Sequence, residues 1–72
     1  MENYIVIESR YGDCTTYGIA LVARADGRQI VLQSIPDLSP DRERVAQFVR
    51  RCADLQLSPL HLDDAAADFL AE

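Results

Sequence analysis

The single histidine and the carboxylates that follow it are the residues of this chain that are best spaced for chemistry. His61, Asp64 and Asp68 are separated by three and four positions, and Glu72 lies one helical turn further. On a helix this spacing aligns the four side chains in one stripe. Such a stripe can form a weak divalent-cation face or an acid–base pair. A solvated acidic face is the plainer interpretation, because one stripe supplies few converging ligands, and we expect no metal and no cofactor.

The two cysteines offer a second candidate chemistry, since Cys52 and His61 could serve as nucleophile and base. However, Cys52 falls on an apolar helical stripe, where a cysteine behaves as a small hydrophobic residue. Cys14 follows Asp13, an acid that disfavours the reactive thiolate. The three glycines stand alone rather than in a phosphate-binding loop. The sequence therefore predicts a protein that is not an enzyme.

The length and the cysteine content indicate the class of protein. A chain of 72 residues forms a single domain of marginal stability. Two cysteines are too few for a disulfide framework, so association with another chain is the remaining way to gain stability. The first residues, "MENYIVIESR", begin with an acid rather than a base, and Glu8 ends their four-residue apolar run. This pattern fits neither a signal peptide nor a membrane span. We expect a cytoplasmic protein with reduced thiols.

The charge distribution disfavours direct nucleic-acid binding. Seven arginines and no lysine stand against twelve acids, for a net charge of −5. The arginines are dispersed, and the segment from Asp54 onward has five acids and no arginine. Phosphate backbones would repel such a surface. The acids at the end of the chain are instead a candidate acidic surface that imitates nucleic acid; they are Asp63, Asp64, Asp68 and Glu72.

Three segments rich in β-branched and aromatic residues predict strands at about residues 4–10, 16–24 and 29–35. The third is expected to stop at Pro36, which cannot donate to a strand ladder. Asp26-Gly27 between two apolar runs is a strong hairpin signal. A two-residue loop there pairs Leu21 with Leu32 and Val22 with Val31. The predicted core face then carries Ile19, Leu21, Ala23, Ile30 and Leu32.

The triplet Leu-Ser-Pro occurs twice, at Leu38–Pro40 and at Leu57–Pro59. Serine is a preferred helix N-cap and proline is favoured at the first helical position. The two triplets therefore predict helices at about residues 40–55 and 59–71. Apolar residues recur at helical spacing in both; they are Val45, Phe48, Val49 and Cys52 in the first, and Leu62, Ala65, Ala66, Phe69 and Leu70 in the second.

These elements predict an α+β domain in which a three-stranded antiparallel meander is followed by a two-helix hairpin on one face of the sheet (β-β-β-α-α). Two helices cover one side of the sheet only. If Ile5 and Ile7 face the helices, the other face is partly apolar and becomes a candidate protein interface, although scattered surface apolar residues are also common. Its residues would be Tyr4, Val6, Ala20, Val22 and Val31.

The sequence resembles an uncharacterised family of short bacterial proteins, a domain of unknown function. The similarity covers most of residues 16–70 and is densest at Tyr17-Gly18, along the first helical stripe, and from Ser58-Pro59 to Leu70. The resemblance implies a bacterial cytosolic domain and assigns no catalytic or binding residue. Members of the family carry a bulkier apolar residue near Ala65 or Ala66, so the resemblance also implies looser packing of the second helix here.

Two functions are consistent with these features. The first is a small cytoplasmic adaptor or regulatory module that binds protein, as a homodimer in its simplest form. The second is an acidic inhibitor or nucleic-acid mimic that binds a nucleic-acid-binding protein, from a mobile element for example. The first would use the neutral sheet face, whereas the second would use the acidic helix.

Overall fold

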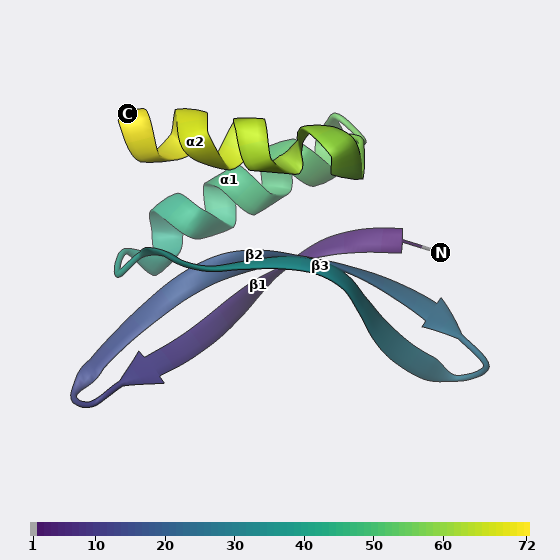
Figure 1. Ribbon diagram of the computed structural model, residues 1–72, viewed down its shortest axis with the longest axis horizontal. Coiled ribbons are helices and arrows are strands. Elements are labelled where there is room, and N and C mark those ends of the chain that lie inside the picture. Colours follow the sequence, from purple (N-terminus) through teal and green to yellow (C-terminus); the bar gives the residue numbers. More distant parts are fainter. Residues whose placement is uncertain (1) are drawn as a thin grey trace.

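Three strands and two helices follow one another in the predicted order. The computed structural model describes residues 2–72: β1 (Glu2–Tyr11), β2 (Cys14–Ala25), β3 (Arg28–Ser39), α1 (Arg42–Asp54), the short 3₁₀ helix η1 (Pro59–His61) and α2 (Leu62–Ala71). The strands form an antiparallel sheet in the order β1-β2-β3, and both helices pack on one face of it (Figure 1). The predicted α+β fold is confirmed. Within residues 2–72, neither helix is long and apolar enough to span a membrane.

Both hairpins turn through two residues. Asp26 and Gly27 have φ of 54° and 76°, which is the type I′ conformation, and the turn pairs Ala25 with Arg28 as predicted. At the other hairpin Gly12 has φ of 62°, as the first central residue of a type II′ turn does. This second turn pairs Tyr11 with Cys14 and so fixes the register of β1.

The register of β1 places Tyr4 and Val6 under the helices. Tyr4 pairs with Leu21 and Val6 pairs with Ile19, and paired residues share a face of the sheet. Tyr4 is buried in the core and Val6 packs against it. The prediction that these two side chains lie on the face away from the helices is therefore wrong; Ile5 and Ile7 lie there instead.

A β-bulge in β3 changes the register beyond Val31. Val22 pairs with Val31 as predicted, but Leu21 pairs with Gln33, so Leu32 is the extra residue. A bulge leaves its extra residue outside the regular alternation of the strand. Leu32 is 51% exposed, and its predicted place in the core is wrong.

Ile30 was also expected in the core, and it is 47% exposed. Its partner is Ala23, as predicted. However, the β2–β3 hairpin extends beyond the ends of both helices and bends away from them (Figure 1). Ile30 thus lies on the correct face of the sheet, at a place that the helices do not cover.

β3 does not stop at Pro36 but continues to Ser39. The pairing shifts again there, so that the segment Pro36–Leu38 lies opposite the single residue Gly18. A Cβ atom on Gly18 would lie 2.7 Å from the Cα of Pro36, a separation that requires glycine. This bulged segment places Leu38 in the core. Proline is tolerated here because the bulge already interrupts the hydrogen bonds between β2 and β3.

The N-cap of α1 is Asp41 and not Ser39. The Asp41 carboxylate accepts hydrogen bonds from the backbone N–H groups of Glu43 (3.1 Å) and Arg44 (3.3 Å). The Ser39 hydroxyl accepts from the Asp41 N–H at 3.0 Å, one step before the helix. Ser58 caps η1 as predicted by accepting from the Leu60 N–H at 3.4 Å. The predicted second helix is therefore divided into η1 and α2.

α1 ends in a Schellman motif that turns the chain toward α2. The N–H of Leu57 donates to the Cys52 carbonyl (3.0 Å) and that of Gln56 to the Ala53 carbonyl (3.1 Å), while Gln56 adopts φ of 50°. The Tyr4 hydroxyl donates to the Leu57 carbonyl at 2.7 Å. The connector between the helices is therefore attached to β1.

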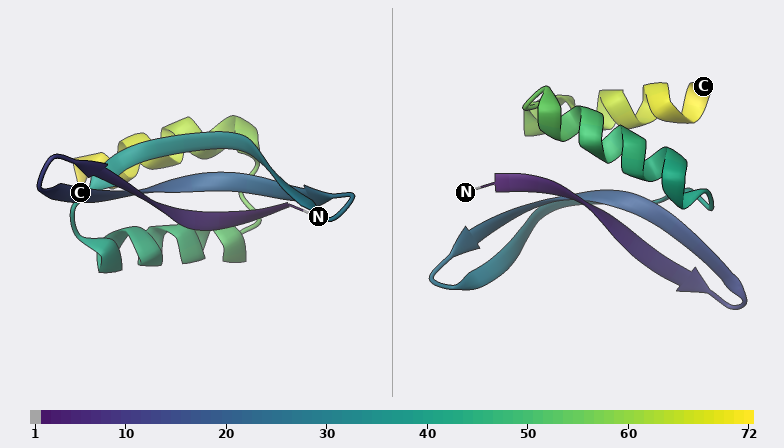
Figure 2. Two further views of the ribbon diagram at one scale, coloured as in Figure 1. Left: turned by 90° about the horizontal axis from the view of Figure 1, so that it is seen from below. Right: turned by 180° about the vertical axis from the view of Figure 1, so that it is seen from behind.

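The two helices lie over opposite sides of the narrow sheet: α1 follows the β1 side and α2 the β3 side (Figure 2). They meet through Phe48 and Phe69, whose ring centroids are 4.9 Å apart. The predicted stripe of α1 is buried throughout, and Leu62, Ala66 and Phe69 of α2 are buried too. Leu70, which belongs to the apolar pattern of the second helix, is 60% exposed.

Candidate functional site

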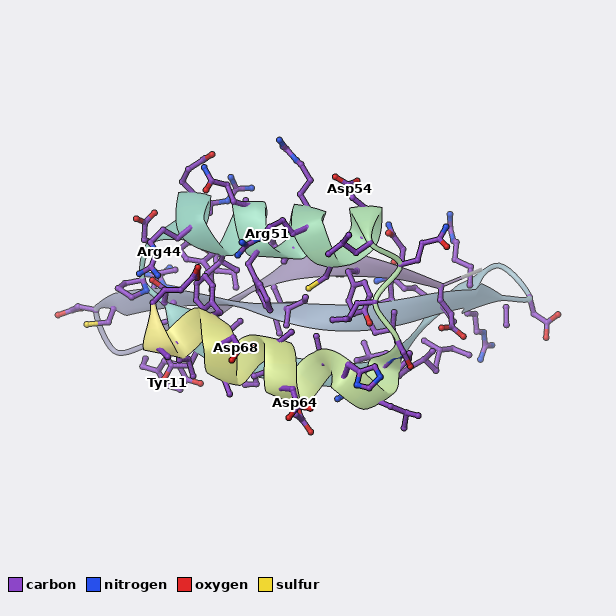
Figure 3. All side chains as sticks on the ribbon, turned by 90° about the horizontal axis from the view of Figure 1, so that it is seen from above. Tyr11, Arg44, Arg51, Asp54, Asp64 and Asp68 are labelled. Carbon is purple, nitrogen blue, oxygen red and sulfur yellow. The ribbon has the colours of Figure 1, made fainter. Side chains whose placement is uncertain are left out.

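The predicted acidic surface lies on the outside of α2. Asp63, Asp64, Asp68 and Glu72 are all exposed, and Asp64 and Asp68 point away from the sheet (Figure 3). Glu72 forms an ion pair with Arg51 of α1 at 3.9 Å. His61 is exposed and its side chain makes no capping hydrogen bond. Within residues 2–72 no three His, Cys, Asp or Glu side chains are grouped so that they could hold a metal ion.

The two cysteines lie in different environments, and both are free thiols. Cys14 is exposed at the tip of the β1–β2 hairpin, whereas Cys52 is buried in the core. Burial raises the pKa of the Cys52 thiol, although the nearby charge of Arg51 acts in the opposite direction. Because a thiol attacks as its thiolate, Cys52 is poorly suited to be a nucleophile.

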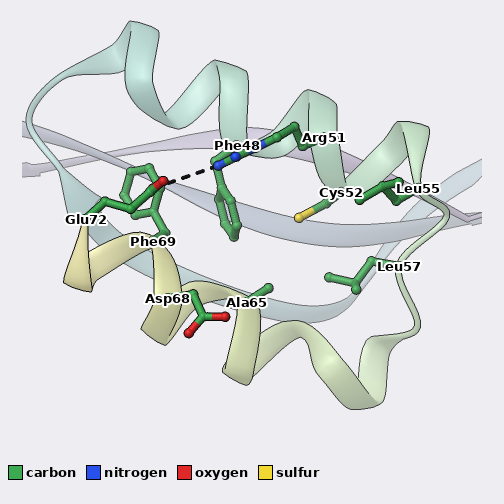
Figure 4. Close-up of a pocket in the computed structure, with 9 residues that line it drawn as sticks. All are labelled: Phe48, Arg51, Cys52, Leu55, Leu57, Ala65, Asp68, Phe69 and Glu72. Carbon is green, nitrogen blue, oxygen red and sulfur yellow. Dashed lines mark ion pairs between the residues drawn. The ribbon is translucent and has the colours of Figure 1, made fainter.

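A pocket of about 270 Å³ lies between α1 and α2 (Figure 4). Apolar side chains form most of its lining, and the Arg51–Glu72 ion pair lies across one end. Ala65 contributes only a methyl group on the α2 side, which leaves the space open. The pocket offers apolar contact and no activated group. Its lining residues are Phe48, Arg51, Cys52, Leu55, Leu57, Ala65, Asp68, Phe69 and Glu72.

The face of the sheet opposite the helices is concave, because both hairpins bend away from the helices (Figure 1). Ala20 and Val22 are on this face, as predicted, yet they are only 1% and 5% exposed. Neighbouring side chains of the curved sheet therefore cover them. Of the five predicted interface residues, Val31 alone offers a largely exposed side chain, at 58%.

Three of the seven large apolar side chains that are exposed within residues 2–72 are consecutive on β3, which is an edge strand. Ile30, Val31 and Leu32 are consecutive and are 47%, 58% and 51% exposed. Ile30 shares the helix-facing side of the sheet with Ala23, and Val31 shares the concave side with Val22. This edge is therefore apolar on both faces of the sheet. From the sequence pattern alone, Ile30 and Leu32 were expected in the core.

β3 also lacks the charges that usually protect an edge strand. The segment from Gln29 to Pro36 has no charged residue, in a chain in which 26% of the residues are charged. The opposite edge strand, β1, carries Glu2, Glu8 and Arg10. Natural sheets use such charges to prevent unwanted strand pairing. The two edges therefore differ in charge: β3 has bulges and Pro36 but no charged residue between Gln29 and Pro36.

The turn geometry shows which backbone groups of β3 are free. The residues that flank a two-residue hairpin loop form a hydrogen-bonded pair, and such pairs alternate along antiparallel strands. Since Ala25–Arg28 flanks the loop, Ile30 points its backbone N–H and C=O toward β2. Gln29 and Val31 point theirs outward, away from the sheet. The most exposed apolar side chain of the strand thus lies beside unpaired backbone groups.

The comparisons with known proteins agree with the resemblance drawn from the sequence. The model of a family of unknown function, DUF6514, matches residues 1–72. The chain belongs to this family. No curated protein and no solved structure matches the chain. Family membership assigns no activity, so the functional argument rests on the surfaces described above.

Proposed function

We propose that this member of the DUF6514 family is a small bacterial cytoplasmic module that binds protein and has no catalytic activity of its own. The observation that carries the proposal is the neutral edge of β3, where Ile30, Val31 and Leu32 are exposed side by side. An exposed apolar edge of this length invites pairing with another strand. We therefore infer that this edge is the contact surface.

The distribution of polar groups supports binding rather than catalysis. The buried thiol of Cys52 has a raised pKa, and His61 lies exposed on a different element. The pocket between the helices is lined mainly by apolar side chains. These features favour a contact role for the domain.

The proposal is tested by capturing partners from a lysate of the host bacterium with the immobilised protein and with Val31→Arg. Because Val31 is 58% exposed, the substitution leaves the monomer folded, which circular dichroism checks. We expect Val31→Arg to lose the bound proteins. Val22→Arg is unsuitable here, since Val22 is buried and an unpaired buried charge unfolds a small domain. Equal capture by both proteins would contradict the proposal.

The exposed acids of α2 support the second candidate, an acidic inhibitor or nucleic-acid mimic. Asp63, Asp64 and Asp68 all face solvent. The double variant Asp64→Asn/Asp68→Asn would remove capture in that case, and binding would weaken steeply between low and high salt. Under the leading proposal the double variant captures the same proteins as the wild type, and salt has little effect.

A further inference from the structure

We infer that the protein pairs with a second copy of itself through β3, antiparallel, about a two-fold axis that passes beside Val31. This inference rests on the proposed function, since it names the partner of the same edge. It joins the two three-stranded sheets into one continuous sheet with all helices on the same face. The free backbone groups, the apolar side chains and the absence of opposed charges each support it.

The backbone groups of Val31 suit a two-fold contact. Val31 directs its N–H and C=O away from β2, as the type I′ turn at Asp26-Gly27 requires. When two antiparallel strands are centred on the same residue, that residue exchanges both hydrogen bonds with its own copy. A closed dimer results, because a two-fold contact uses the same surface on both chains.

The side chains around Val31 are self-complementary in this arrangement. A two-fold axis at Val31 places Val31 opposite its copy. It brings Ile30 of one chain next to Leu32, the bulge residue, of the other. All three are about half exposed in the single chain. Apolar cross-strand pairs stabilise antiparallel sheets, so the contact buries three apolar side chains that are about half exposed in the monomer.

The charges do not oppose the pairing. The segment centred on Val31 is uncharged from Gln29 to Pro36, whereas like charges on facing strands are destabilising. The same argument does not apply to β1, because Glu2, Glu8 and Arg10 occupy that edge. A second copy can therefore approach β3 without burying a charge, in spite of the net charge of −5.

Disulfide trapping tests the register directly. In a Cys14→Ser background, which removes the exposed native thiol, Val31→Cys is compared with Gln29→Cys under mild oxidation. Both positions are exposed, on the same strand and the same side. Across a hydrogen-bonded antiparallel pair the two Val31 Cα atoms would be about 5.5 Å apart, within the range of a disulfide. The two copies of Gln29 would be separated by about 13 Å along the strands.

We expect Val31→Cys to form a covalent dimer almost completely and Gln29→Cys to remain a monomer. Equal cross-linking of both variants would overturn the register. A Val31→Cys chain that stays monomeric, and sediments as a monomer up to millimolar concentration, would overturn self-association. If Val31→Arg still abolished capture of other proteins in that case, the proposed function would stand and only the identity of the partner would change.

Discussion

Tyr4 is the residue whose hydrogen bond most directly joins the sheet to the helical layer. Its hydroxyl donates to the Leu57 carbonyl at 2.7 Å while its ring packs in the core. Tyr4→Phe keeps the ring and removes the donor, so we expect a loss of about 1 kcal/mol in the free energy of unfolding. Urea denaturation measures it. Tyr11→Phe is the matched control, because Tyr11 is 56% exposed and should unfold like the wild type; equal losses in both would contradict the role given to Tyr4.

The buried hydroxyl of Tyr4 and the buried thiol of Cys52 are uncharged at neutral pH, and they predict how stability depends on pH. Burial is the main cause that raises the pKa of Tyr4, with further contributions from Cys52 and Glu2, and burial also raises the pKa of Cys52. Each group binds its proton more tightly in the folded state, so its contribution is complete below the unfolded pKa and is lost as pH rises. We expect stability to fall above about pH 8.5, the ordinary thiol pKa, and further above about pH 10, that of tyrosine.

Denaturation curves between pH 7 and pH 11 measure this dependence. Tyr4→Phe should lose the upper part of the decline and keep the lower part, which belongs to Cys52. A stability that stays constant or rises between pH 8 and pH 11 would show that the two groups are not buried as described.

The helix caps show how far residue chemistry can be predicted locally. The Ser-Pro signal located both helix starts to within two or three residues, and it identified Ser58 correctly. At the first helix, Ser39 and Asp41 are both good caps two positions apart. Asp41 is the cap because the long bulge in β3 keeps Ser39 within the strand. That bulge depends on Gly18, which is distant in the sequence, so local patterns could not reveal it.

At the scale of elements, the orientation of β1 was the error with the largest consequence. The segment Tyr4–Ile7 is apolar at every position, so alternation does not indicate which side faces the core. The turn does indicate it: Gly12-Asp13 as a two-residue loop pairs Tyr11 with Cys14 and hence Tyr4 with Leu21. The signal was therefore present in the sequence, in the turn rather than in the strand.

The exposed edge of β3 could not be predicted from its pattern. Ile30-Val31-Leu32 is typical of a buried strand, and the hairpin register was correct as far as Val31. The bulge at Leu32 and the bend of the hairpin beyond the helices are tertiary features (Figure 1). They turned predicted core residues into the candidate site.

The gap between the helices gives a prediction at the same scale. Ala65 lines the pocket between α1 and α2, whereas Ala66 is 4% exposed and faces the packed core. Ala65→Leu should fill the space and raise the free energy of unfolding by about 0.5–1 kcal/mol. Ala66→Leu should overpack the core and lower it by about 1–3 kcal/mol. Urea denaturation of the two variants separates them, and the same sign for both would contradict the described packing of α2.

At the scale of the whole molecule, the two faces and two edges of the sheet have different roles. The helices cover one face, and the curvature of the sheet buries much of the other. Charges protect the β1 edge. The β3 edge is apolar and carries no charge from Gln29 to Pro36. A domain of this size buries a limited core of its own, and it would gain stability from the strand that we propose to be added there.

Amide hydrogen exchange at Val31, followed by NMR over a range of protein concentrations, tests the β3 contact most directly. The Val31 N–H points away from β2 and faces water in a single chain, whereas the Ile30 N–H points toward β2 and is an internal reference. We predict that protection at Val31 rises with protein concentration while protection at Ile30 is present throughout. A Val31 amide that exchanges as fast as in an unstructured peptide at every concentration, beside a protected Ile30, would contradict pairing of this edge.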